Sequence, residues 1–199
     1  MRFGIAFLLL VAACGDKPEE APEGLPRPPD QRPSGTEKPP PEPPPIDGKT
    51  DAEWKSVGTR KLGWDLEISV PEKWTDGYMV IDEGRQIHFK GPAEDQGIRA
   101  ELQFGWKASD TSIDDLVRKR IGDLERLPNG KVEEKGPVTI GGMPGTYFVY
   151  ASGDKREIDF YFGGHGCIGF VRGWSPARLY AESLPVFREA AARVRYNPQ

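Results

Sequence analysis

The sequence predicts an α+β fold: an antiparallel sheet with one long helix inserted midway and a C-terminal helix packed on it. Several segments of residues 64–174 alternate apolar and polar side chains, the period of two typical of strands with one buried face. Two further segments carry apolar residues at helical spacing, and turns rich in glycine and proline separate these segments. Residues 50–199 are long enough for one globular domain with its own core, and all five tryptophans lie there.

The first half of this domain reads as strands. Residues 64–70 alternate cleanly, Pro71 ends the run, and residues 72–74 form a turn. Residues 79–81 and 86–90 are typical of a hairpin joined through Asp-Glu-Gly. Apolar residues at every second position of 98–106 predict a further strand.

A helix is expected next. Residues 109–112 offer several N-cap side chains, and Thr111 with Asp114 approximates a capping box. Pro128-Asn129-Gly130 ends the segment. Its apolar face comprises Ile113, Leu116, Val117, Ile121 and Leu124.

Strands are predicted over about 131–140, 146–151, 155–162 and 167–174, with a tight Gly-Gly-His-Gly turn before the last. Gly141 to Gly145 are interpreted as a hairpin turn, because they lie between strands and lack the helix N-terminus of a phosphate site. Asp159 alternates with apolar neighbours and is expected to face water. A final helix over about 179–194 follows, with Pro185 early in it or at a short break.

Three segments resemble PsbP-like and DcrB-like domains. Residues 63–74 are similar to that family's opening aromatic strand followed by Val-Pro and Trp, residues 111–116 to its helix entry, and residues 138–145 to its Gly-x-Pro-Gly hairpin. The likeness covers about residues 55–196. It implies an α/β/α sandwich around an antiparallel sheet, used mostly by non-enzymatic proteins, and it implies no shared catalytic residues.

The N-terminus predicts an exported, lipid-anchored protein. Arg2 precedes an apolar run, residues 5–13, which is shorter than the roughly 20 residues that cross a bilayer. Val11 to Cys14 resemble the bacterial lipobox, which implies cleavage between Ala13 and Cys14 and lipidation of Cys14. The alternative is an ordinary signal peptide with a coincidental cysteine. Residues 1–13 are thus predicted to be a lipoprotein signal peptide.

In such lipoproteins an aspartate directly after the cysteine favours retention at the inner membrane. Gly15 stands there, which favours the outer membrane of a bacterial cell envelope.

Residues 14–49 comprise the predicted lipidated cysteine, Cys14, and a proline-rich linker after it. It holds 12 of the chain's 20 prolines and has few apolar side chains, so we expect a disordered, partly polyproline II spacer. The alternative is a ligand for another protein's aromatic groove, favoured only by residues 39–45.

Charge argues against nucleic acid as a partner. Residues 50–199 carry 21 basic and 23 acidic residues, interspersed and without a cationic stripe. Cys167 is left without an intrachain partner once Cys14 is acylated, and we expect it to be buried.

No catalytic residue, metal site or cofactor is predicted. His165 and Cys167 are the sharpest catalytic candidate, but side chains two apart on a strand begin about 6.5–7 Å apart. The apolar residues after Cys167 are also typical of an inert cysteine. His88 and His165 belong to no metal-ligand spacing.

Aromatic residues offer a better functional signal. They crowd both faces of the strands after residue 146, and two helices would cover much of one face but not all of the other. Most of these residues are expected in the core. Tyr161, Arg172 and Trp174 are the candidate interaction surface, because such residues are enriched at interface anchors.

The expected function is therefore that of a membrane-anchored envelope lipoprotein. It would act as a non-catalytic binding or accessory module for another envelope component, an envelope protein or an apolar ligand. The alternatives are a carrier of a small apolar ligand or lipid, which needs an apolar cavity of about 300 Å³ or more, and an unrecognised envelope hydrolase.

Overall fold

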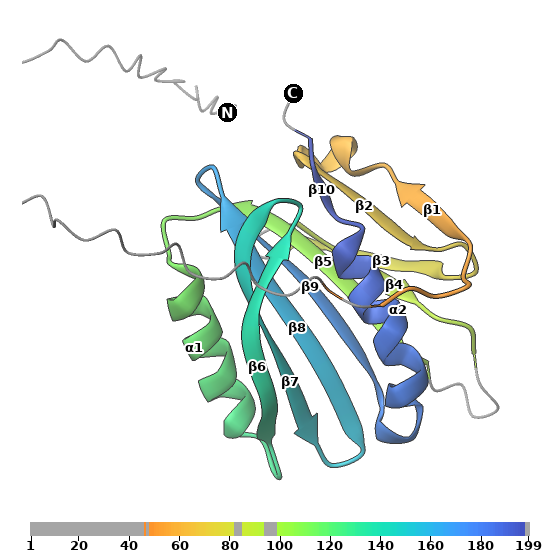
Figure 1. Ribbon diagram of the computed structural model, residues 1–199, viewed down its shortest axis with the longest axis vertical. Helices are drawn as coiled ribbons and strands as arrows, with labels where there is room; N and C mark the ends of the chain where they lie inside the picture. Colours follow the sequence, from red (N-terminus) through yellow and green to blue (C-terminus); the bar gives the residue numbers. More distant parts are fainter. Residues whose placement is uncertain (1–45, 47, 82–84, 94–98, 198–199) are drawn as a thin grey trace, which may run out of the picture. The chain divides into compact units, whose positions relative to one another are not determined.

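The computed structural model describes residues 46, 48–81, 85–93 and 99–197 (Figure 1). By compactness the chain divides into residues 1–40 and 41–199, and every described residue belongs to the second unit. Ala13, Cys14 and the linker up to residue 45 lie outside the described residues.

A seven-stranded antiparallel sheet dominates the domain, in the order β3-β4-β5-β9-β8-β7-β6. Its strands are β3 (Thr75–Ile81), β4 (Arg85–Lys90), β5 (Glu101–Ala108), β6 (Lys131–Ile140), β7 (Met143–Ser152), β8 (Lys155–Gly164) and β9 (Cys167–Pro176).

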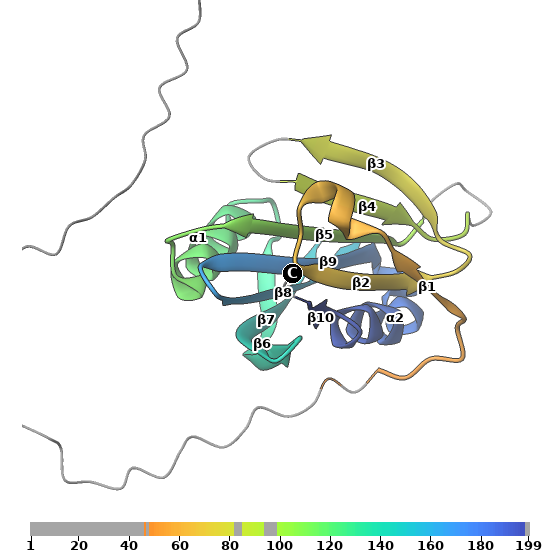
Figure 2. The ribbon, with the colours of Figure 1, turned by 90° about the horizontal axis from the view of Figure 1, so that it is seen from above.

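A second, three-stranded sheet has the order β1-β2-β10. It comprises β1 (Trp54–Val57), β2 (Leu66–Pro71) and β10 (Arg195–Tyr196), and a short 3-10 helix, η1 (Thr59–Leu62), links β1 to β2. Figure 2 shows this small sheet close to the C-terminal helix. The sequence predicts one sheet, and the second was missed because β1 and β10 are too short to show a clear period.

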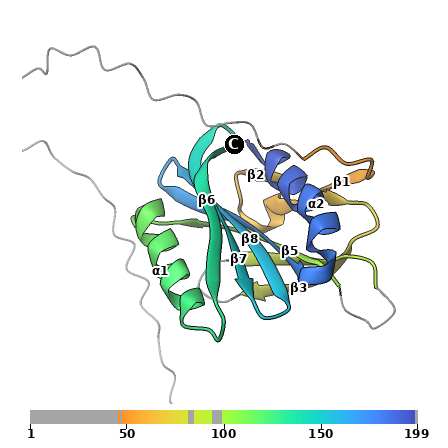
Figure 3. The same cartoon turned by 60° about the horizontal axis from the view of Figure 1, so that its bottom comes forward.

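Two helices pack on the large sheet. The inserted helix α1 (Ile113–Glu125) contacts β6, β7 and β8, and the C-terminal helix α2 (Tyr180–Ala192), preceded by η2 (Ala177–Leu179), contacts β9, β8 and β2. Figures 1 and 3 show the helices well apart, with β6 to β8 between them. The predicted α+β class is confirmed.

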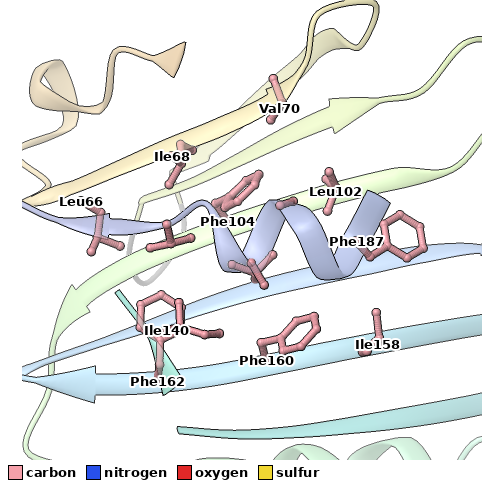
Figure 4. Close-up of a cluster of buried hydrophobic side chains, with 14 of the residues drawn as sticks. Leu66, Ile68, Val70, Leu102, Phe104, Ile140, Ile158, Phe160, Phe162 and Phe187 are labelled. Atoms are coloured by element: carbon pink, nitrogen blue, oxygen red, sulfur yellow. The ribbon is translucent and has the colours of Figure 1, made fainter. Parts of the chain in front are cut away.

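The two faces of the large sheet build two apolar clusters. The larger lies between the sheet, β2 and α2, and Figure 4 shows its side chains from all three pointing toward one another. The smaller lies under α1 and contains Val117, Leu124, Phe148, Tyr150 and Tyr161. Because Phe148 and Tyr150 flank Val149 of the larger cluster, the strand period assigns the helices to opposite faces.

The start of α1 differs from the expected capping box by one residue. Ser112 is the N-cap, and its Oγ accepts a hydrogen bond from the Asp115 backbone N–H at 3.1 Å. Its hydroxyl also donates to the Asp115 carboxylate at 2.7 Å.

Two tight turns have the expected chemistry. His165 and Gly166 both have positive φ, 56° and 73°, as the two-residue turn between β8 and β9 requires. Gly141 and Gly142, at 59° and 81°, form the turn between β6 and β7. That turn is shorter than predicted, since Met143 to Gly145 already belong to β7.

The segment that enters the domain runs along α2. Ile46 packs against the larger cluster, and a Cβ at Gly48 would lie 2.7 Å from Cβ of Arg188. The Thr50 backbone N–H donates to Oε2 of Glu189 at 2.6 Å. Residues 46, 48 and 50 thus all contact the sheet domain.

Candidate functional site

The candidate site is the sheet face that also carries α1, where four strands place polar and aromatic side chains in rows. Residues Glu157, Asp159 and Tyr161 share this face of β8 because side chains alternate along a strand. The register sets Asp159 beside Arg172, and Glu157 beside Trp174 on β9.

The rows continue onto β5 and β4. Arg172 lies opposite Gln103, and Gln103 lies opposite His88 on β4. Trp174 lies opposite Glu101. We call the face over β4, β5, β9 and β8 the open face, because its side chains around Gln103, Arg172 and Trp174 are only half-buried.

An ionic network lies at the edge of the open face, beside α1. The Arg172 Nε donates to Asp159 Oδ1 at 2.8 Å and lies 3.5 Å from Glu157 Oε1. From α1, Arg120 donates through Nε to Asp159 Oδ2 at 3.2 Å and through Nη2 to Glu157 Oε1 at 2.5 Å. The Lys155 Nζ lies 2.9 Å from Glu157 Oε2.

The acids of this network are buried, whereas the cations are partly exposed. The side chains of Glu157 and Asp159 are 2% and 1% exposed, and those of Arg172, Arg120 and Lys155 are 16%, 28% and 42% exposed. Three cations therefore face two carboxylates, and the positive groups form the solvent side.

This burial corrects the expectation that Asp159 faces water. The strand period assigns Asp159 to the face opposite Ile158 and Phe160, as expected, but Arg120 of α1 covers that face. Buried charges persist only when they are paired and hydrogen-bonded, and both carboxylates are.

The surroundings shift the pKa values of Glu157 and Asp159 in opposite directions. Burial alone would raise the pKa of Glu157, but Arg172, Lys155 and Arg120 together hold it below its usual value. Burial raises the pKa of Asp159, since it outweighs the attraction of Arg172.

The same network raises the pKa values of Arg172 and Tyr161. Burial opposes the charge of Arg172, yet Asp159 and the other nearby acids raise its pKa, so the guanidinium stays charged. Burial and the charge of Asp159 raise the pKa of Tyr161 to about 12, so its hydroxyl remains protonated at neutral pH.

The structure brings the three candidate residues of the sequence analysis together. Arg172 Nη2 donates to the Tyr161 hydroxyl at 3.3 Å, and Arg172 Nη1 donates to Gln103 Oε1 at 3.2 Å. Trp174 Nε1 donates to Glu101 Oε2 at 3.0 Å. Tyr161 is buried, whereas Arg172 and Trp174 are half-buried.

Cationic side chains also lie over aromatic rings on this face. The Lys155 Nζ is 4.7 Å from the Trp174 ring centroid, and the Arg172 guanidinium carbon is 5.2 Å from that of Phe170. Glu157, Arg120 and Lys155 belong to the site but were not predicted from the sequence. Two acids at alternate positions of an otherwise apolar strand were the available signal.

The His165 and Cys167 pair has a different environment. Cys167 is half-buried at the start of β9, instead of fully buried, and it packs against the larger cluster. Burial and the nearby charge of Asp65 raise the pKa of its thiol, the reverse of what a nucleophilic thiolate requires. His165 stacks on Tyr196 at 4.5 Å between ring centroids.

Residues 46, 48–81, 85–93 and 99–197 contain no group of three or more His, Cys, Asp or Glu side chains able to hold a metal ion. In the same part of the chain, none of the helices has the length and apolar character needed to span a bilayer.

Three clefts of about 430 to 530 Å³ occur among the described residues, and all are open with charged linings. One lies beside Trp74 and Lys73, one between α1 and Lys135 of β6, and one between Tyr180 and Glu133.

No family model and no curated protein matches the chain. Solved structures match it at low identity. The solution structure of the cyanobacterial PsbP protein (CyanoP) from Synechocystis is 11% identical over 75% of this chain and 95% of that chain, with a TM-score of 0.54.

Two further structures are similar. LpqN, involved in cell envelope biogenesis of Mycobacterium tuberculosis, is 10% identical over 75% of this chain and 93% of that chain, with a TM-score of 0.53. The protein PA94 from Pseudomonas aeruginosa is 16% identical over 74% of this chain and 99% of that chain, with a TM-score of 0.50. The chain thus has a PsbP-like fold.

Proposed function

We propose that this protein is a lipid-anchored lipoprotein of the bacterial cell envelope whose α+β domain acts by binding. In this role it is a non-catalytic accessory or interaction module for another envelope component. The observation that carries the proposal is the open face, where Arg172 and Trp174 are half-buried and held by hydrogen bonds.

The residue types on this face and the fixed position of the Arg172 side chain both support a binding role. Tryptophan, tyrosine and arginine dominate the binding energy of protein interfaces. Arg172 is fixed by Asp159, Gln103 and Tyr161, so little side-chain entropy remains to be lost when a partner binds.

Envelope placement rests on the N-terminal sequence. The apolar run before Cys14 and the lipobox-like Val11 to Cys14 support an acyl anchor, and Gly15 supports the outer membrane over the inner. LpqN, which shares the fold, is involved in cell envelope biogenesis.

Site-specific photo-crosslinking of the full chain in cells tests the binding role. A benzophenone amino acid replaces Lys107, which is exposed on β5 and shares the open face, or Glu182, which is exposed on α2. We expect one discrete envelope adduct from position 107 and none from position 182. Equal adducts from both positions, or none from either, would contradict the proposal.

Metabolic labelling with an alkyne fatty acid tests the anchor. We expect label on the wild type and none on the Cys14→Ser variant, which should leave the outer-membrane fraction. Label retained by Cys14→Ser would exclude Cys14 as the acylated residue.

A further inference from the structure

The open face carries a preorganised set of cationic donors. Arg120, Arg172 and Lys155 all contact Glu157, and two of them contact the same oxygen, so their charged groups lie close together. Their carboxylate partners are almost fully buried, while the cations retain solvent exposure.

Donor capacity remains after these contacts. A guanidinium has five N–H donors and an ammonium has three. Arg120 uses Nε and Nη2, and its Nη1 donates to no group in the described part of the chain. Lys155 has one carboxylate contact, to Glu157.

The charge balance favours an anion at this position. Within the network three cations face two buried carboxylates, which leaves one cation in excess. The buried acids also hold the cations in place before binding, which lowers the entropy lost on association. Hydrogen bonds between a guanidinium and a carboxylate are short, directional and stronger than neutral ones.

We propose that the partner inserts an acidic side chain between Arg120, Arg172 and Lys155, so that its carboxylate accepts from the remaining donors of Arg120 and Lys155 and lies against the Arg172 guanidinium. This inference rests on the proposed binding function and names the chemistry that the open face recognises.

The surroundings favour one carboxylate on a protein over a polyanionic surface. Glu101 lies beside Trp174 on the same face and would repel a second negative group. Trp174 and Phe170 provide half-buried aromatic contact area around the cations, which suits a protein interface.

NMR titration of the full chain in neutral detergent tests this proposal. The probes are the peptide Ac-Gly-Glu-Gly-NH2, its matched glutamine peptide and inorganic phosphate, and the signals are the arginine Nε–H groups. We expect saturable shifts of the Arg120 and Arg172 signals with the glutamate peptide, and about tenfold weaker binding of the glutamine peptide.

Variants define the site. Arg120→Gln and the more exposed Lys155→Gln should each weaken glutamate-peptide binding about fivefold or more. Arg118→Gln removes the same charge from an exposed position of α1 and should change it less than about twofold. Thermal unfolding identifies variants that fail to fold. If Arg120→Gln fails to fold, Lys155→Gln still tests the site.

Three outcomes would overturn the inference. They are an absence of shifts with the glutamate peptide, equal shifts of every arginine including Arg118, and phosphate binding as tight as that of the peptide. Position-dependent crosslinking at Lys107 without peptide binding would refute only the acidic partner. Absence of that crosslinking would refute the binding function itself.

Discussion

Replacing Arg172 with methionine should reveal how strongly the buried network supports the fold. Methionine keeps most of the side-chain length but removes the charge. The change leaves Asp159, which is 1% exposed, without its 2.8 Å partner. It also removes the 3.5 Å contact to Glu157.

The expected cost follows from burial. Removing one partner of a buried ion pair costs about 3–5 kcal/mol, because an uncompensated charge stays in the interior. Arg120 still contacts Asp159 at 3.2 Å, so we expect the lower end, about 3 kcal/mol. The control Arg118→Met breaks an exposed pair with Asp115 and should cost about 0.3–0.5 kcal/mol.

Urea unfolding followed by tryptophan fluorescence measures both variants. The double variant Arg172→Met with Asp159→Leu removes the stranded charge and adds an apolar side chain beside Phe148, its neighbour on β7. We expect it to recover at least half of the lost free energy of unfolding, because apolar replacement of a buried ion pair is often neutral or stabilising.

Two results would refute this reasoning. One is a loss below about 1 kcal/mol for Arg172→Met, which would place the pair in the range of exposed salt bridges. The other is a double variant whose loss equals the sum of the losses measured separately for Arg172→Met and for Asp159→Leu, because the two side chains would then be energetically independent.

Four further substitutions probe the fold. Gly173→Ala should lower the free energy of unfolding by about 1–3 kcal/mol, since its Cβ would lie 2.2 Å from the buried Phe187 ring. Gly122→Ala, with open space around it in α1, should raise that free energy by up to about 1 kcal/mol. Urea unfolding measures both. Ser112→Ala removes the N-cap of α1 and should lower the free energy of unfolding by about 1 kcal/mol. Burial lowers the pKa of His88 from its usual 6.5, so the unfolded chain binds more protons than the folded chain once the pH falls below that value. The free energy of unfolding should therefore decrease as the pH drops from 7 to 5. His88→Gln should flatten this pH dependence in unfolding measured at pH 5 to 7.

Strong periodicity made much of the fold predictable. The alternation of residues 64–70 and the helical spacing of 113–124 correspond to β2 and α1. Glycine turns located the hairpin between β8 and β9. The short β1 and β10 could not be predicted, because two to four residues define no period.

The candidate site was only half predictable. Residue type pointed to Tyr161, Arg172 and Trp174, but alternation assigns Asp159 only to a face and does not say what covers that face. The cover is Arg120, 39 residues earlier on α1. Such a contact depends on strand register and helix docking, which a single sequence does not specify.

The way the chain enters the domain determines where tension would act. Ile46, Gly48 and Thr50 attach the incoming segment to α2, on the sheet side away from the open face. A pull along the preceding residues would load this segment and the Thr50 to Glu189 hydrogen bond first, and then α2. Force would reach the sheet through the packing of α2, for instance Phe187 on Gly173, on the face opposite the cations of the open face.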